Sequence, residues 1–200
     1  SSLEKAIKLN PNYAEAYNNL GNVYKEIKKY EKAITHYEKA IELNADYYEA
    51  YNNLGVALGK NEQYEEAEKV LNNVIQMHPK FADAYNSLGA ILTSMEKYTE
   101  AKETLNHAIS IKPDNAEAYY NLATSLNKKG DLENAIKYYK KTIAINPKHF
   151  KSYMNLGSIY VRFGNYETAI KYYKKALPLD DNQSIFFGVI LFDINYSPDM

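Results

Sequence analysis

The sequence repeats one eight-residue segment, Ala14-Glu15-Ala16-Tyr17-Asn18-Asn19-Leu20-Gly21, at a constant interval. The next copy begins 34 residues later and reads Tyr48-Glu49-Ala50-Tyr51-Asn52-Asn53-Leu54-Gly55. The same offset leads to related segments at residues 82–89, 116–123 and 150–157, without an insertion. Self-similarity at a period of roughly 20–50 residues indicates a repeat protein.

Within each copy, the apolar residues keep the spacing of one helical face. Tyr17, Leu20 and Gly21 stand at i, i+3 and i+4, as on the buried side of a helix. A turn follows, and a second helix is predicted to begin near Tyr30, with the small residue Ala33 on its buried face. Equivalent helices are predicted to begin near Tyr64, Tyr98, Leu132 and Tyr166. Proline after most second helices ends them, because proline cannot continue the backbone ladder.

This order of aromatic, Leu, Gly, Ala and Pro residues resembles the tetratricopeptide repeat family over residues 1–183. The resemblance implies an all-α fold, a right-handed α-α superhelix of helix-turn-helix repeats whose first helices line a concave groove. A hairpin cannot bury its apolar face alone, so each repeat needs its neighbours. We expect the end of a preceding repeat at 1–13, five repeats at 14–47, 48–81, 82–115, 116–149 and 150–183, and a partial sixth helix and tail at 184–200.

First-helix residues that the packing does not use are expected to line the groove. The candidate peptide-binding residues are Asn18, Asn19, Asn22, Asn52, Asn53, Asn86, Ser87, Tyr120, Asn121, Thr124, Asn155, Ser158 and Arg162. Four of them, Asn19, Asn53, Asn121 and Asn155, share one repeat position, where Ser87 is the departure. An Asn side chain offers one acceptor and two donors, which match a peptide backbone. The positions resemble the asparagine ladder of O-linked N-acetylglucosamine transferase, and a protein or peptide partner is implied.

A second binding mode of the family is less well matched. Its chaperone-binding members clamp a C-terminal carboxylate with Lys and Asn side chains on successive first helices. Here Asn18, Asn52 and Asn86 stand where that clamp has Lys, and only Lys151 and Arg162 supply late positive charge. The resemblance therefore favours recognition of a peptide backbone.

The end of the chain carries two further hypotheses. Leu191 to Asp199 resembles the junction between tetratricopeptide repeats and the catalytic domain of bacterial O-linked N-acetylglucosamine transferase-like proteins. The resemblance implies a substrate-recognition arm whose glycosyltransferase domain follows Met200. Alternatively, an exposed apolar surface supports self-association as a homodimer. That surface consists of Phe186, Phe187, Ile190, Leu191 and Phe192.

Composition argues against several other functions. The formal net charge is −1 and cysteine is absent, so neither nucleic acid nor a membrane is an expected partner, and thiolate chemistry is excluded. The four histidines, His36, His78, His107 and His149, stand at different repeat positions and are interpreted as scattered surface residues, not metal ligands. We expect no cofactor, no catalytic residue in this chain itself, and a cytoplasmic setting.

Overall fold

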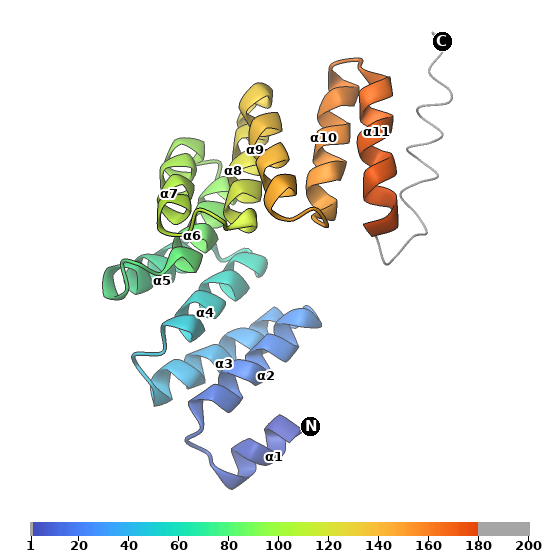
Figure 1. Ribbon diagram of the computed structural model, residues 1–200. Coiled ribbons are helices and arrows are strands. Elements are labelled where there is room, and N and C mark those ends of the chain that lie inside the picture. The colour runs from blue at the N-terminus through green and yellow to red at the C-terminus, as the bar shows by residue number, and fades with distance from the viewer. Residues whose placement is uncertain (1, 180–200) are drawn as a thin grey trace. The chain divides into compact units, whose positions relative to one another are not determined.

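The computed structural model describes residues 2–179, which fold into helices joined by short turns, without a strand in that range (Figure 1). The helices are α1 (Ser2–Leu9), α2 (Ala14–Glu26), α3 (Tyr30–Leu43), α4 (Tyr48–Lys60), α5 (Tyr64–Met77), α6 (Ala82–Ser94), α7 (Tyr98–Ile111), α8 (Ala116–Lys129), α9 (Leu132–Ile145), α10 (Phe150–Arg162), α11 (Tyr166–Ala176) and the 3-10 helix η1 (Leu177–Leu179). The predicted all-α class of helix-turn-helix repeats is confirmed.

The helices form two compact units, Ser1–Pro113 and Asp114–Met200. In the first unit, α2 packs on α3, α4 on α5 and α6 on α7, and among the first helices α4 contacts both α2 and α6. In the second unit, α8 packs on α9 and α10 on α11, while α9 also contacts α10. The second helices begin at the predicted residues, and α5 ends at Met77, just before Pro79.

Close helix contact inside each hairpin depends on the small residue that follows the repeated Leu. A Cβ atom at Gly89 would lie 2.4 Å from Cγ of Leu105, a separation that real carbon atoms do not adopt. The same holds at Gly55, where the nearest atom would be Cγ of Leu71 at 2.6 Å. The glycines therefore let the second helix press its large side chain directly onto the backbone of the first. The predicted small residues of the second helices are fully buried: Ala33, Ala67, Ala101, Ala135 and Ala169.

The turn inside each hairpin contains one residue with positive φ at an equivalent position. Glycine occupies it in the second unit, at Gly130 (φ 91°) and Gly164 (φ 69°), where a side chain would be strained. The residue after each glycine, Asp131 or Asn165, caps the next helix by accepting a backbone N–H. In the first unit, Lys28, Glu62 and Glu96 adopt the left-handed conformation, and their following residues make no side-chain cap bond. The turns of the second unit therefore combine a glycine at the positive-φ position with a side-chain cap on the next helix, and those of the first unit have neither.

Two hypotheses fall on residues 180–200. The partial sixth helix and tail at 184–200, with the self-association set Phe186, Phe187, Ile190, Leu191 and Phe192, lies outside the described residues. The segment Leu191 to Asp199, which resembles a junction with a catalytic domain, lies there too. Both remain predictions.

Candidate functional site

In the first unit, a buried amide connects the first two repeats. Asn18 on α2 is 6% exposed, and its Oδ1 accepts a hydrogen bond from Nδ2 of Asn53 on α4 at 3.0 Å. The Asn18 side chain also lies beside the Tyr47 hydroxyl, where it opposes the increase in the pKa of Tyr47 that burial causes. Asn18 therefore joins neighbouring repeats, and one of the two Asn53 donors is already used. Asn19, the next residue, is exposed.

Asn22 is held by the second helix of its own hairpin. Its Oδ1 accepts hydrogen bonds from the Tyr37 hydroxyl at 2.8 Å and from Nζ of Lys25 at 3.4 Å. Tyr37 is fully buried. Burial, together with the nearby Glu26 carboxylate, raises the pKa of the Tyr37 hydroxyl, so it donates throughout the physiological pH range. The Asn22 amide is thereby fixed in orientation.

Asn52 on α4 differs from its equivalent Asn18 because its Oδ1 is buried without a hydrogen-bond partner in the described part of the chain. The residues that surround Asn52 differ from the equivalent residues around Asn18, one repeat earlier. Ser87 replaces Asn53, which donates to Asn18, and Phe81, which has no hydroxyl, replaces Tyr47. A buried acceptor without a partner costs about 1–3 kcal/mol.

Asn86 and Ser87 on α6 are half-buried, and Asn86 has an interaction partner.

Phe81→Tyr is expected to raise the free energy of unfolding of the first unit by about 1 kcal/mol. Phe81 is the equivalent of Tyr47, whose hydroxyl lies beside Asn18, so the new hydroxyl is expected to lie beside Asn52 and to donate to its Oδ1. Urea-induced unfolding followed by circular dichroism measures the change. Phe163→Tyr, which adds a hydroxyl to an exposed ring, is the control and should leave stability unchanged. A Phe81→Tyr protein no more stable than the parent would contradict this account of Asn52.

In the second unit, a buried tyrosine organises the candidate residues. Tyr139 on α9 is 0% exposed. Its hydroxyl accepts a hydrogen bond from Nδ2 of Asn155 at 3.0 Å and lies 3.2 Å from Oγ1 of Thr124. Burial raises the pKa of this hydroxyl, and the neighbouring polar side chains of Thr124, Asn127 and Asn155 partly oppose the shift.

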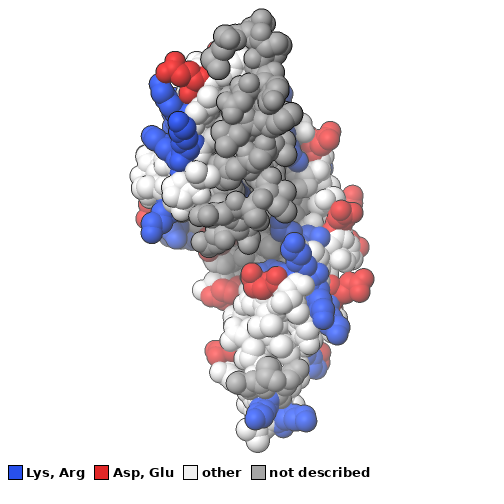
Figure 2. All heavy atoms as spheres, turned by 90° about the vertical axis from the view of Figure 1, so that its right-hand side faces the viewer, with Lys and Arg blue, Asp and Glu red and all other residues white. Residues whose placement is uncertain are grey.

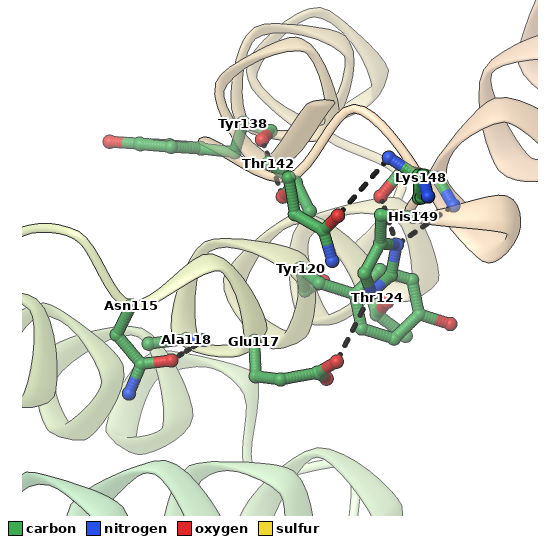
Figure 3. Close-up of polar contacts among 11 residues, drawn as sticks. Asn115, Glu117, Ala118, Tyr120, Thr124, Tyr138, Thr142, Lys148 and His149 are labelled. Carbon is green, nitrogen blue, oxygen red and sulfur yellow. Dashed lines mark hydrogen bonds and ion pairs between the residues drawn. The ribbon is translucent and has the colours of Figure 1, made fainter. Parts of the chain in front are cut away.

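A second polar contact joins α8 to the start of α10 (Figure 3). Nδ1 of His149 accepts from the backbone N–H of Ser152 at 3.3 Å, which leaves Nε2 to donate to Oε1 of Glu117 at 3.2 Å. This hydrogen bond, more than the charge of the imidazole, lowers the pKa of the Glu117 carboxyl. The Tyr120 ring lies 4.7 Å from the imidazole, centroid to centroid.

The interpretation of the histidines as scattered surface residues is wrong for His149, which is 8% exposed. Its position at the start of α10 makes it a helix cap, and a cap is buried where two hairpins meet. The other three histidines also pack on tyrosine rings: His36 on Tyr17 and Tyr24, His78 on Tyr48, and His107 on Tyr85. Between residues 2 and 179, no three His, Cys, Asp or Glu side chains gather as metal ligands would.

The remaining candidates lie at the edge of the second unit. Arg162 is exposed and donates from a guanidinium nitrogen to Oδ1 of Asn127 at 3.2 Å, and Ser158 is exposed. Asn121 is half-buried and has an interaction partner. Sequence reasoning missed the Tyr37 and Tyr139 hydroxyls as members of these networks. The sequence nevertheless contained a signal, because the residue types at two repeat positions vary together. Where the first helix has polar Asn22 or Thr124, the second helix has Tyr37 or Tyr139. Where the first helix has apolar Val56 or Ala90, the second helix has Leu71 or Leu105.

No helix between residues 2 and 179 is both long enough and apolar enough to cross a membrane.

Several solved structures share this fold. A crystal structure of MamA is 27% identical, with a TM-score of 0.65, and covers 82% of this chain and 96% of its own. YrrB, titled "a TPR protein with an unusual peptide-binding site", is 24% identical, with a TM-score of 0.60 and 98% coverage of both chains. PilF of Pseudomonas aeruginosa is 19% identical, with a TM-score of 0.74 over 91% of this chain and 80% of its own. At these identities the last two show the fold alone.

Family models agree with the structural likeness. One model described as tetratricopeptide repeat matches residues 80–148 and again 114–182, which together span more than half of the chain. Two further models of the same description match residues 14–47 and 36–69. A comparison with curated protein sequences gave no match. With the 34-residue period, the paired helices and the buried small residues, these matches show that the chain belongs to the tetratricopeptide repeat family.

Proposed function

We propose that this protein is an interaction scaffold whose first helices bind extended peptide or protein segments. The observation that carries the proposal is the buried Oδ1 of Asn52, for which residues 2–179 supply no hydrogen-bond donor. Asn52 as a whole is half-buried, so its side chain can turn outward to accept a backbone N–H of a bound peptide, while the unused donor of neighbouring Asn53 reaches a backbone carbonyl. Because both groups read main chain, the site accepts many side-chain sequences.

The asparagines at the repeat position of Asn53 are expected to contribute unequally to peptide binding. Asn19 is exposed and available to a guest chain, whereas Asn155 already donates to the Tyr139 hydroxyl at 3.0 Å. Internal hydrogen bonds hold a side chain in one rotamer, so less conformational entropy is lost when a ligand binds. The networks around Asn22 and Asn155 therefore pre-orient polar groups on the first helices. YrrB, described as a TPR protein with an unusual peptide-binding site, is one example of this fold with such a site.

Asn52→Ala is expected to weaken peptide binding by about tenfold, the equivalent of one buried hydrogen bond to the ligand. The probe is a peptide of about ten uncharged residues, selected from a random library on the parent protein and measured by fluorescence polarisation. Asn72→Ala, the same change on an exposed second-helix position of α5, is the matched control. Equal affinity of the parent and the Asn52→Ala protein would remove Asn52 from the binding site.

Two finer hypotheses concern residues beyond the described range. The arm of an O-linked N-acetylglucosamine transferase-like enzyme requires a nucleotide-sugar-binding region in the reading frame after Met200. A homodimer through Phe186, Phe187, Ile190, Leu191 and Phe192 requires that sedimentation change when residues 184–200 are removed. The cytoplasmic setting and the absence of a nucleic-acid partner likewise stay predictions.

A further inference from the structure

Charge is divided unevenly along the chain. Residues 114–179 contain 11 Lys or Arg against 5 Asp or Glu, a net charge of +6, whereas residues 2–113 contain 13 against 16, a net charge of −3. Residues 180–200 contain four Asp and no Lys or Arg, which makes the net charge of the whole second unit +2. The overall balance near zero hides this division. Figure 2 shows basic side chains gathered at the upper left of the face that it presents. A charge asymmetry between parts of a chain is a physical argument about partners, not about the fold.

The excess comes from one motif that occurs twice on the second helices. Lys-Tyr-Tyr-Lys-Lys begins at Lys137 on α9 and again at Lys171 on α11, 34 residues later. We call the six exposed lysines of these motifs the basic face: Lys137, Lys140, Lys141, Lys171, Lys174 and Lys175. Both motifs lie in the second unit, on helices α9 and α11 that each pack against α10.

The repeat framework does not require lysine at these places. The equivalent residues of the first three repeats are Thr35, Glu38, Lys39, Lys69, Asn72, Asn73, Glu103, Asn106 and His107. Lysines four residues apart, such as Lys137 and Lys141, repel each other and destabilise the helix slightly. Favourable interaction with the helix dipole accounts for Lys174 and Lys175 in the last turn of α11, but the last turn of α9 contains no base.

Few of these charges are neutralised inside the described part of the chain. Lys171 pairs with Glu167 at 2.7 Å, and both side chains are largely exposed. The other five lysines of the basic face form no ion pair with a residue between 2 and 179. Two of the five, Lys137 and Lys141, lie over the rings of Tyr138 and Tyr119, and none of the five faces a carboxylate in that range. Exposed lysines that repel one another without a carboxylate partner are retained at a small loss of stability, which an external anion would offset.

The aromatic rings among the lysines are already occupied. The Tyr160 and Tyr172 rings stack at 5.5 Å with an interplanar angle of 8°, and Nζ of Lys141 lies 5.8 Å from the centroid of the Tyr119 ring. Binding of single-stranded nucleic acid depends on aromatic faces that are free to stack with bases. The sequence has a single arginine, Arg162, although arginine is the usual residue for phosphate recognition. These features favour carboxylates over nucleic acid.

We propose that the basic face binds an acidic protein segment, rich in Asp and Glu, at a site separate from the first-helix groove. Lysine rows on α9 and α11 present ammonium groups about one helical turn apart, about 5.4 Å along each axis. An extended acidic segment that crosses both rows meets several of them at once. Long-range attraction would speed the encounter, and affinity would fall as salt is raised.

The test measures binding of a fluorescent glutamate peptide of about ten residues to the full 200-residue chain. Replacement of all six lysines of the basic face by glutamine is expected to weaken binding at least about tenfold and to flatten its salt dependence. The matched control changes exposed lysines on second helices of the first unit: Lys32→Gln, Lys69→Gln and Lys102→Gln. The control should bind the glutamate peptide as the parent does.

Stability provides the second measurement. The six-glutamine protein should melt at the same temperature as the parent or above it, because like charges have been removed from both helices. Loss of binding with intact helicity and stability supports the proposal. Equal loss in the Lys32, Lys69 and Lys102 control, or tighter binding of oligothymidylate than of the glutamate peptide to the parent, would overturn it. The uncharged peptide used to test Asn52 should bind the six-glutamine protein with the affinity of the parent. The two peptides therefore test the first-helix groove and the basic face independently.

Discussion

Gly89→Val is expected to lower the free energy of unfolding of the first unit by about 3 kcal/mol. Its Cβ would lie 2.4 Å from Cγ of Leu105, which is fully buried and is held between the helices of its hairpin. Leu105 cannot withdraw without separating α6 from α7. The loss should appear as a lower urea midpoint by circular dichroism.

Two neighbouring substitutions separate this clash from a general effect of valine in a helix. Ala90→Val should be nearly neutral, because Val56 occupies the equivalent position in the preceding repeat. Gly89→Ala places the same Cβ against Leu105 but lacks the two γ-methyl groups of valine, and alanine favours the helix over glycine by about 1 kcal/mol, so its loss should be smaller than that of Gly89→Val. If Gly89→Val and Ala90→Val were equally stable, close helix contact at Gly89 would not be a determinant of the fold.

Tyr139→Leu is expected to lower the free energy of unfolding of the second unit by about 3 kcal/mol. Leucine is a natural residue at this repeat position, as Leu71 and Leu105 show, so the loss would come from the surroundings. Asn155 would lose the acceptor of its Nδ2 hydrogen bond, and the space of the phenol ring would be left partly empty. Urea unfolding of the single variant gives the size of the effect.

A double variant tests whether the polar partner explains that loss. Tyr139→Leu with Thr124→Val reproduces the Leu71 and Val56 pair of the second repeat. It should recover about 1 kcal/mol relative to Tyr139→Leu alone, because the Thr124 hydroxyl no longer lies beside an apolar group. Tyr139→Phe removes the hydroxyl but keeps the ring, so its free energy of unfolding should lie between those of the parent and of Tyr139→Leu. Additive losses in the double variant would show that Thr124 and Tyr139 are not coupled.

Much of the architecture could be predicted from local pattern. The second helix of each hairpin begins where the pattern predicts, from Tyr30 in the first repeat to Tyr166 in the fifth. Fully buried Ala33 and Ala101 were recognisable as small residues in apolar stripes. These features depend on helix periodicity and side-chain size, which nearby residues contain and which recur every 34 residues.

The functions of individual polar residues could not be predicted in the same way. Asn18 and Asn19 are adjacent and identical, yet the first is buried and bonded to Asn53 and the second is exposed. Within the described residues Asn52 Oδ1 has no partner, because Phe81 and Ser87, at the start of α6 and within it, provide no donor there. His149 was misjudged because its burial depends on Ser152 and Glu117, the latter 32 residues earlier.

The sequence by itself therefore determined the repeat, the helices and the small residues at close contacts, since side-chain size and helical period are local properties. Only the tertiary structure decided which amides keep an unused donor or acceptor, and that α9 and α11, which carry the two lysine motifs, both pack against α10. The physical reason is that hydrogen bonding and electrostatic attraction depend on which groups lie within a few ångströms. Packing of one hairpin on the next brings those groups together from distant parts of the chain.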